Sequence, residues 1–149
     1  MTFAMIVSRR PVSGQTKSPK SKENYKAEIR NHAREAFTFE ELLSGELYAR
    51  IIWFYKGRIE GDVDNIIKPI LDAIRGIVYR DDNIVVKCVS EKFDKTRDLV
   101  ISPINISDDL YQDLLFAIAD DSTNHNLYIE VGQIAPRTVT FGPIDGGSK

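Results

Sequence analysis

Cysteine and histidine are almost absent from this chain, which has one cysteine and two histidines in 149 residues. The single Cys88 excludes an internal disulfide, as in a reducing cytosol, and its alternating apolar neighbours predict a place in the core or in a sheet. His32 and His125 show no Cys/His spacing typical of zinc sites, so a structural or surface role is expected. No apolar run reaches the length of a membrane span, and no signal-peptide pattern is present. We therefore expect a soluble cytoplasmic protein without a membrane partner.

Several catalytic signatures are also missing. The sequence has no glycine-rich phosphate loop and no Ser-His-Asp or Cys-His arrangement that can be nominated. An EF-hand counted from Asp62 fails, because its sixth position is Ile67 instead of glycine and its twelfth is Ala73 instead of glutamate.

The composition that remains is that of one globular domain, with 42% hydrophobic and 28% charged residues. The net charge of −2 argues mildly against a nucleic-acid partner, but the charge is unevenly distributed. Residues 1–37 carry eight Lys/Arg and three Glu, whereas residues 99–149 carry two basic and seven acidic residues. A basic N-terminal region can contact phosphates even in an acidic protein. The alternative is a solvated helix face with a loose N-terminal loop.

Hydrophobic patterning predicts a single α+β domain over residues 1–149, with a mixed β-sheet of about four to six strands and two to three helices. Expected strands are residues 2–8, 46–55 (central), 83–93 and 99–106, the last reached by a hairpin turn at 94–97, with one or two more from Leu127. Expected helices begin at Ser18-Pro19 and run to about Phe37, cover 64–74 before Gly76, and follow Ser107 to about Ala119. The first helix should present Tyr25, Ile29, His32 and Ala36 on one face.

Aspartates gather around the short central helix. Asp62 and Asp64 precede it, and period-2 alternation in an extended segment would place both on one face. Asn65, Lys68, Asp72 and Arg75 then share the polar helix face, and Asp81-Asp82 return before the next strand. Pro69 suggests that the regular helix starts near Ile66, which leaves Asp64-Asn65 in a bent, non-helical segment.

Clustered carboxylates can hold a hard divalent cation, which takes oxygen ligands and activates phosphate esters. A structural interpretation is also open: Asp64 as a helix cap, Asp62 as a turn residue and Asp81-Asp82 as a solvated turn.

The ordered motif resembles the RusA family of Holliday junction resolvases. The family signature is Asp-x-Asp-Asn-x-x-Lys-x-x-x-Asp-Ala-Leu followed by a returning Asp-Asp. This chain matches every polar position from Asp62 to Asp82, with Ile74 in place of the leucine. The basic Arg10-Pro11-Val12-Ser13 loop resembles the family more loosely, and an extension from about residue 107 does not align.

The resemblance implies a Mg²⁺-dependent endodeoxyribonuclease of bacterial or phage type that acts as a homodimer on four-way DNA junctions. By position, Asp62, Asp64 and Asp82 would bind Mg²⁺, and Lys68 would assist catalysis. Asn65 or Asp72 would support these ligands, and Asp81 could be a ligand or a turn former. The expected DNA-backbone contacts are Arg9, Arg10, Lys17, Lys20 and Lys22. A non-cutting junction-binding protein of the same fold, and a metal-dependent nuclease on another nucleic acid, remain alternatives.

Overall fold

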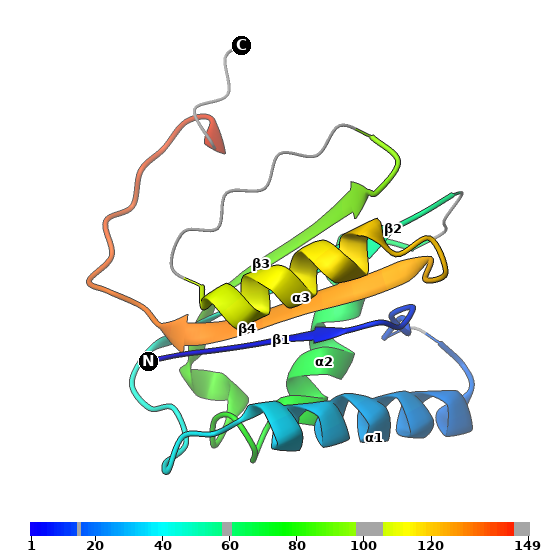
Figure 1. The fold of residues 1–149 in the computed structure, drawn as a ribbon. Helices are drawn as coiled ribbons and strands as arrows, with labels where there is room; N and C mark the ends of the chain where they lie inside the picture. Colours follow the sequence, from blue (N-terminus) through cyan, green and yellow to red (C-terminus); the bar gives the residue numbers. More distant parts are fainter. Residues whose placement is uncertain (15, 58–60, 98–105, 145–149) are drawn as a thin grey trace.

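The computed structural model describes residues 1–14, 16–57, 61–97 and 106–144 (Figure 1). Its strands are β1 (Thr2–Val7), β2 (Leu47–Tyr55), β3 (Val85–Asp94) and β4 (His125–Gln133). Its α-helices are α1 (Pro19–Ala36), α2 (Ile67–Ile74) and α3 (Asp108–Ala119), and two 3₁₀ turns are η1 (Val63–Ile66) and η2 (Asp82–Ile84). The predicted α+β domain with a mixed sheet is therefore confirmed.

The sheet has the order β1-β4-β2-β3, with β2 parallel to β3 and β4 antiparallel to both β1 and β2. The prediction that the second strand is central is confirmed, because β2 lies between β4 and β3. The sequence left open one or two strands after Leu127, and the described residues form one, which starts at His125 and inserts between β1 and β2.

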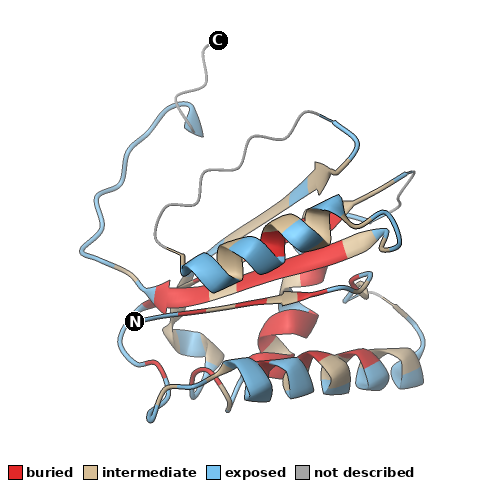
Figure 2. Ribbon diagram, viewed as in Figure 1, coloured by how far each residue is buried: buried red, intermediate tan, exposed pale blue. Residues whose placement is uncertain are grey.

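Helices cover both faces of the sheet (Figure 1). Alternate residues of β1 show this arrangement: Phe3 and Met5 join the larger core with α1 and α2, whereas Ala4 and Ile6 pack in a smaller core beneath α3. Buried residues accordingly run along the strands and along the inner faces of the helices (Figure 2). The site described below lies on the side of the sheet that α1 and α2 cover.

Helix α1 starts where the sequence predicts, because the Ser18 hydroxyl accepts a hydrogen bond from Ser21 N at 3.3 Å and Pro19 follows at the first helical position. The predicted inner face is partly wrong. Tyr25, Ile29 and Ala33 are buried, whereas His32 and Ala36 are exposed. The stripe follows the i, i+4, i+8 positions, so Ala33 and not its neighbours continues the contact with the sheet.

The remaining predictions about the fold divide into confirmed, corrected and untested ones. Helix α3 is confirmed, with the Ser107 hydroxyl accepting from Leu110 N at 3.2 Å. Cys88 lies in the sheet as expected, but it is exposed in β3 and not part of the core. The predicted strand at 99–106 lies almost wholly outside the described residues. None of the described helices is long and apolar enough to cross a membrane.

Lys95 ties the end of α3 to the sheet. Its ammonium donates to Ala117 O at 3.1 Å, Thr123 O at 2.9 Å and Asn126 Oδ1 at 2.8 Å. Desolvation lowers the pKa of this ammonium. We expect Lys95→Met to lower the free energy of unfolding by about 1.5–3 kcal/mol, because several carbonyl oxygens lose a charged donor. Urea denaturation measures the change against Lys87→Met, an exposed position of β3; equal effects would contradict the role of the network.

Candidate active site

The segment that carries Asp62 and Asp64 is held against the sheet by β2 and β3. Gly61 has φ +138°, and a Cβ at this position would lie 3.3 Å from the Trp53 ring, so this close approach requires glycine. From β3, the Ser90 hydroxyl donates to Val63 O at 2.6 Å and the Lys92 ammonium donates to Gly61 O at 3.3 Å. Neither β3 residue could be predicted from the sequence, since no local pattern links them to residues 61–63.

The backbone of the two aspartates differs from the prediction. Asp62 is extended (φ −104°, ψ 144°) and precedes η1, but Asp64 lies inside the 3₁₀ turn, so period-2 alternation does not relate their side chains. The bent, non-helical segment expected at Asp64-Asn65 is also wrong, because these residues are in 3₁₀ conformation. The α-helix proper starts at Ile67, which makes Pro69 its third residue. The missing N–H of Pro69 therefore breaks no helical bond, since the first N–H groups of a helix have no partner within it.

Asp82 faces the end of α2. Its Oδ1 accepts a hydrogen bond from the Tyr79 hydroxyl at 3.0 Å, and its Oδ2 lies 3.4 Å from the Arg75 guanidinium. The Tyr79 hydroxyl also lies 2.8 Å from Leu71 O, so its single proton is shared between this carbonyl and Asp82, which connects Asp82 to the backbone of α2. Burial, followed by the Asp82 charge, raises the pKa of Tyr79 far above its ordinary value, so Tyr79 remains a hydrogen-bond donor.

Asp81 forms the turn that presents Asp82. Its carboxylate accepts from Asp82 N at 2.7 Å, and it stands at the N-cap of η2. Of the two roles left open for Asp81, this contact favours the turn former.

Lys68 and Asp72 form an ion pair along the polar face of α2. Lys68 Nζ lies 3.5 Å from Asp72 Oδ1, at the i,i+4 spacing, and Lys26 Nζ of α1 lies 3.8 Å from Asp72 Oδ2. The Lys68 side chain is 80% exposed, whereas that of Asp72 is 19% exposed. Lys68 thus extends into solvent just after η1, while Asp72 is flanked by two cations.

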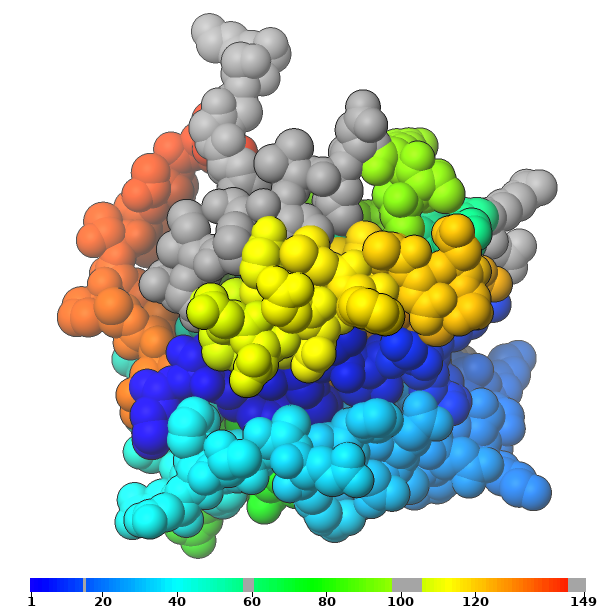
Figure 3. All heavy atoms as spheres, viewed as in Figure 1, coloured from blue at the N-terminus to red at the C-terminus, as the bar shows by residue number. Residues whose placement is uncertain are grey.

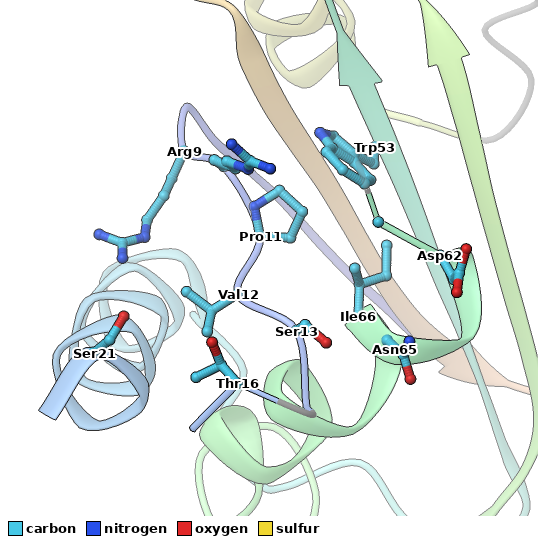
Figure 4. Close-up of a pocket in the computed structure, with 12 residues that line it drawn as sticks. Arg9, Pro11, Val12, Ser13, Thr16, Ser21, Trp53, Asp62, Asn65 and Ile66 are labelled. Atoms are coloured by element: carbon cyan, nitrogen blue, oxygen red, sulfur yellow. The ribbon is translucent and has the colours of Figure 1, made fainter. Parts of the chain in front are cut away.

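The basic loop before α1 docks directly beside the acidic segment (Figure 4). Gly14 N donates to Asn65 O at 2.8 Å, and Lys22 Nζ donates to Gly14 O at 2.8 Å. Asn65 therefore contributes its backbone carbonyl to the docking of this loop. The sequence predicts the two segments separately but contains no signal that they meet, because the contact joins residues 51 positions apart.

A cavity of about 520 Å³ separates the loop from the acidic segment. Figure 4 shows Arg9, Pro11 and Ser13 along one wall and Trp53, Asp62 and Ile66 along the other. Arg10 lines the same cavity. The cavity is therefore lined by cations on one side and bounded by a predicted ligand on the other, which suits an anionic substrate.

The five predicted DNA contacts lie in different surroundings. Arg9 pairs with Glu28 at 3.0 Å and stacks over the Tyr25 ring, with 5.0 Å between its guanidinium carbon and the ring centroid. Lys22 is half-buried against Gly14, whereas Arg10, Lys17 and Lys20 are exposed. Part of the Arg9 charge is therefore neutralised within the protein, and Arg10, Lys17 and Lys20 are the more exposed of the five positions.

The predicted metal ligands are chemically suitable but not assembled. Carboxylate oxygens are the ligands that a hard divalent cation prefers, and Asp62 and Asp64 are exposed. Within the described ranges, however, no three His, Cys, Asp or Glu side chains lie close enough together to hold a metal ion. Asp82 is instead engaged by Arg75 and Tyr79.

Residues 6–102 match the family model described as Endodeoxyribonuclease RusA. The chain belongs to the RusA family. The matched region runs from β1 through β3 and contains the basic loop, the aspartate segment and Asp82. Helix α3, strand β4 and the residues that follow lie beyond it. No curated protein matches the sequence.

Tyr79→Phe tests how much the hydroxyl that contacts Asp82 contributes to the stability of this RusA-family protein. The variant keeps the buried ring but removes the donor to Leu71 O and Asp82 Oδ1, so we expect a loss of about 1–2 kcal/mol in the free energy of unfolding. Urea denaturation measures it, with Tyr111→Phe on α3 as the matched control. Stability equal to that of the control would show that the hydroxyl contributes nothing.

Proposed function

We propose that this RusA-family protein is a Mg²⁺-dependent, structure-selective endodeoxyribonuclease that cuts opposing strands of four-way DNA junctions as a homodimer. The observation that carries the proposal is the docking of the basic loop on the aspartate segment, which joins Gly14 to Asn65 beside a cavity lined by Arg10 and Asp62. Phosphate-binding groups and carboxylates are thereby held on one surface. Membership of the family supports the endonuclease assignment.

The residues of the site have different roles in phosphodiester hydrolysis. Asp62, Asp64 and Asp82 would hold Mg²⁺, which when bound neutralises charge on the phosphate and lowers the pKa of a water nucleophile. Exposed Lys68 offsets charge on the non-bridging oxygens as it develops. Asp81 supports the turn around Asp82, and Tyr79 orients its carboxylate.

DNA contacts outside the reacting phosphate come from the basic loop and the start of α1. Arg10, Lys17 and Lys20 are exposed there, with Lys22 and Arg9 behind them. Such contacts position the backbone without reading its sequence. A two-fold dimer would present two identical sites to two symmetry-related phosphates of a junction.

Removing one ligand charge should stop cleavage and spare binding. We expect Asp64→Asn and Asp82→Asn each to reduce junction cleavage at least about 100-fold, because the cation loses a charged ligand. Junction affinity should change less than about threefold, since most phosphate contacts come from Arg and Lys. Asp113→Asn on α3 is the matched control.

The assay uses labelled four-way, flap and duplex DNA, each with Mg²⁺ and with EDTA. If Asp64→Asn or Asp82→Asn cleaves the four-way junction at the wild-type rate, the assignment of the active site is wrong. Binding of junctions without cutting under every condition would identify a junction-binding protein, and preferential flap cleavage would identify a nuclease for another DNA structure. A parallel assay with RNA substrates separates the remaining alternative.

The salt dependence of junction binding tests the basic loop. Each phosphate contact that is lost should reduce the slope of log K against log salt concentration by about 0.9. We expect Arg10→Ala to reduce it by about one and the Arg9→Ala/Arg10→Ala pair to reduce it further. Arg34→Ala, near the other end of α1, is the control. If the variants have the same slope as the wild type, the basic loop does not contact DNA phosphates.

A further inference from the structure

Strand β1 forms one edge of the sheet and lies at the bottom of a groove. In the part of the chain that the structure describes, β1 pairs only with β4. Two hollows of about 630 and 200 Å³ follow it, one lined from Ala4 to Ser8 and the other from Thr2 to Ala4. They share Ala4, Ala36 and Leu110, so together they make one groove along β1, which we call the β1 groove.

Space-filling atoms show the same arrangement. Figure 3 shows β1 as a dark blue band between α3, in yellow, and α1, in lighter blue to cyan. The strand is thus open along its outer side, where an edge strand offers unpaired backbone N–H and C=O groups. A groove of this form can accept one more extended segment by strand addition.

The α3 wall of the β1 groove is apolar and acidic. Leu110 and Phe116 supply apolar surface, and the Phe116 side chain is 81% exposed. Asp113 and Asp120 lie on the same wall, and Glu35 lies on the α1 wall. The carboxylates disfavour DNA in this groove, whereas an extended segment without acidic residues would suit it.

The chain itself contains such a segment after β4. Residues 138–144 (Thr-Val-Thr-Phe-Gly-Pro-Ile) contain no acidic residue and alternate polar and apolar side chains at their start. Val139 is 75% exposed, Phe141 91% and Ile144 83%. Figure 2 shows the segment as a pale blue extension beside the folded body. So much exposed apolar surface in one extended segment is typical of a binding site for another surface.

This segment starts at the opposite edge of the sheet from β1. Ile134 N donates to Glu46 O at 3.0 Å next to β2, and Arg137 then donates to Val86 O of β3 at 3.5 Å and pairs with Glu46 at 3.3 Å. Crossing back over the sheet to β1 takes about 14 Å, since strands are about 4.8 Å apart. Residues 138–144 span at most about 23 Å, which would leave too few residues to pair along β1.

We propose that Thr138–Ile144 of a second copy of this chain lies along β1 as an added strand, and that the exchange is reciprocal. Val139 and Phe141 share one face of an extended strand, where they pack against Leu110 and Phe116 of α3. Thr138 and Thr140 face the polar wall of α1. A reciprocal exchange closes a two-fold dimer without further contacts. The tail and α3 lie outside the family match, and the exchange does not depend on nuclease activity.

The first test is the oligomeric state. We expect the wild type to form a dimer in light scattering after size exclusion, and Phe141→Asp and Phe116→Asp each to weaken dimerisation at least tenfold. Leu42→Asp, a partly exposed apolar position outside the groove, is the control and should leave the dimer intact. Circular dichroism checks that each variant is folded. A monomeric wild type, or a dimer that neither groove nor tail variant weakens, would overturn the proposal.

A disulfide test identifies the occupant of the groove. In a Cys88→Ser background, mixing Phe116→Cys chains with Phe141→Cys chains should give a disulfide between the two chains under mild oxidation. Ser122→Cys, exposed beyond the end of α3, replaces Phe141→Cys in the control and should give little product. A third sample is a single chain that carries both Phe116→Cys and Phe141→Cys. If this chain forms its disulfide within a monomer, the tail occupies its own groove and the proposal is wrong. Neither measurement uses DNA. The dimer proposal can therefore be tested even if the protein proves not to be a nuclease.

Discussion

The burial of one short helix determines where Lys68 and Asp72 lie and where the partners of Asp82 are placed. Helix α2 has eight residues, too few to be stable alone in water, so its position depends on packing. Ile66, Ile70 and Ile74 are at most 2% exposed in the larger core, and a fully buried isoleucine contributes about 1.5–3 kcal/mol. With this face fixed against the sheet and α1, Lys68 and Asp72 lie on the opposite, polar face of the helix.

The carboxylates around α2 differ in how far nearby cations neutralise them. Asp72 is flanked by Lys26 and Lys68, and Asp82 by Arg75, so the interior side of the acidic cluster is already compensated. Asp62 and Asp64 remain exposed at the outer end, next to the basic loop. An anionic phosphate approaching this end meets attraction from the loop and repulsion from the carboxylates. A cation bound to the carboxylates would replace this repulsion with attraction. Metal binding and substrate binding are therefore expected to be coupled.

Local signals predicted much of this structure, and contacts distant in sequence account for what they missed. Ser18-Pro19 and Ser107 define helix starts through bonds to their own neighbours, so the sequence contains the whole signal. The extended geometry expected for Asp64 was wrong, because this residue lies in a 3₁₀ turn that ends at the buried Ile66. The contact of Gly14 with Asn65 joins two segments that no periodicity relates.

Strand β4 shows why the C-terminal third cannot be treated as an addition to a complete nuclease domain. Both β1 and β2 pair with β4, and Leu127, Ile129 and Val131 are fully buried in the larger core. The region matched to the family ends before β4, yet without this strand β1 would lose its only described partner in the sheet. The same strand delivers the chain to the exposed tail, while the acidic α3 covers the other face of the sheet. The basic loop and the acidic β1 groove are lined by side chains of opposite charge, so the proposed DNA contacts and the proposed contact with a second chain would use different residues.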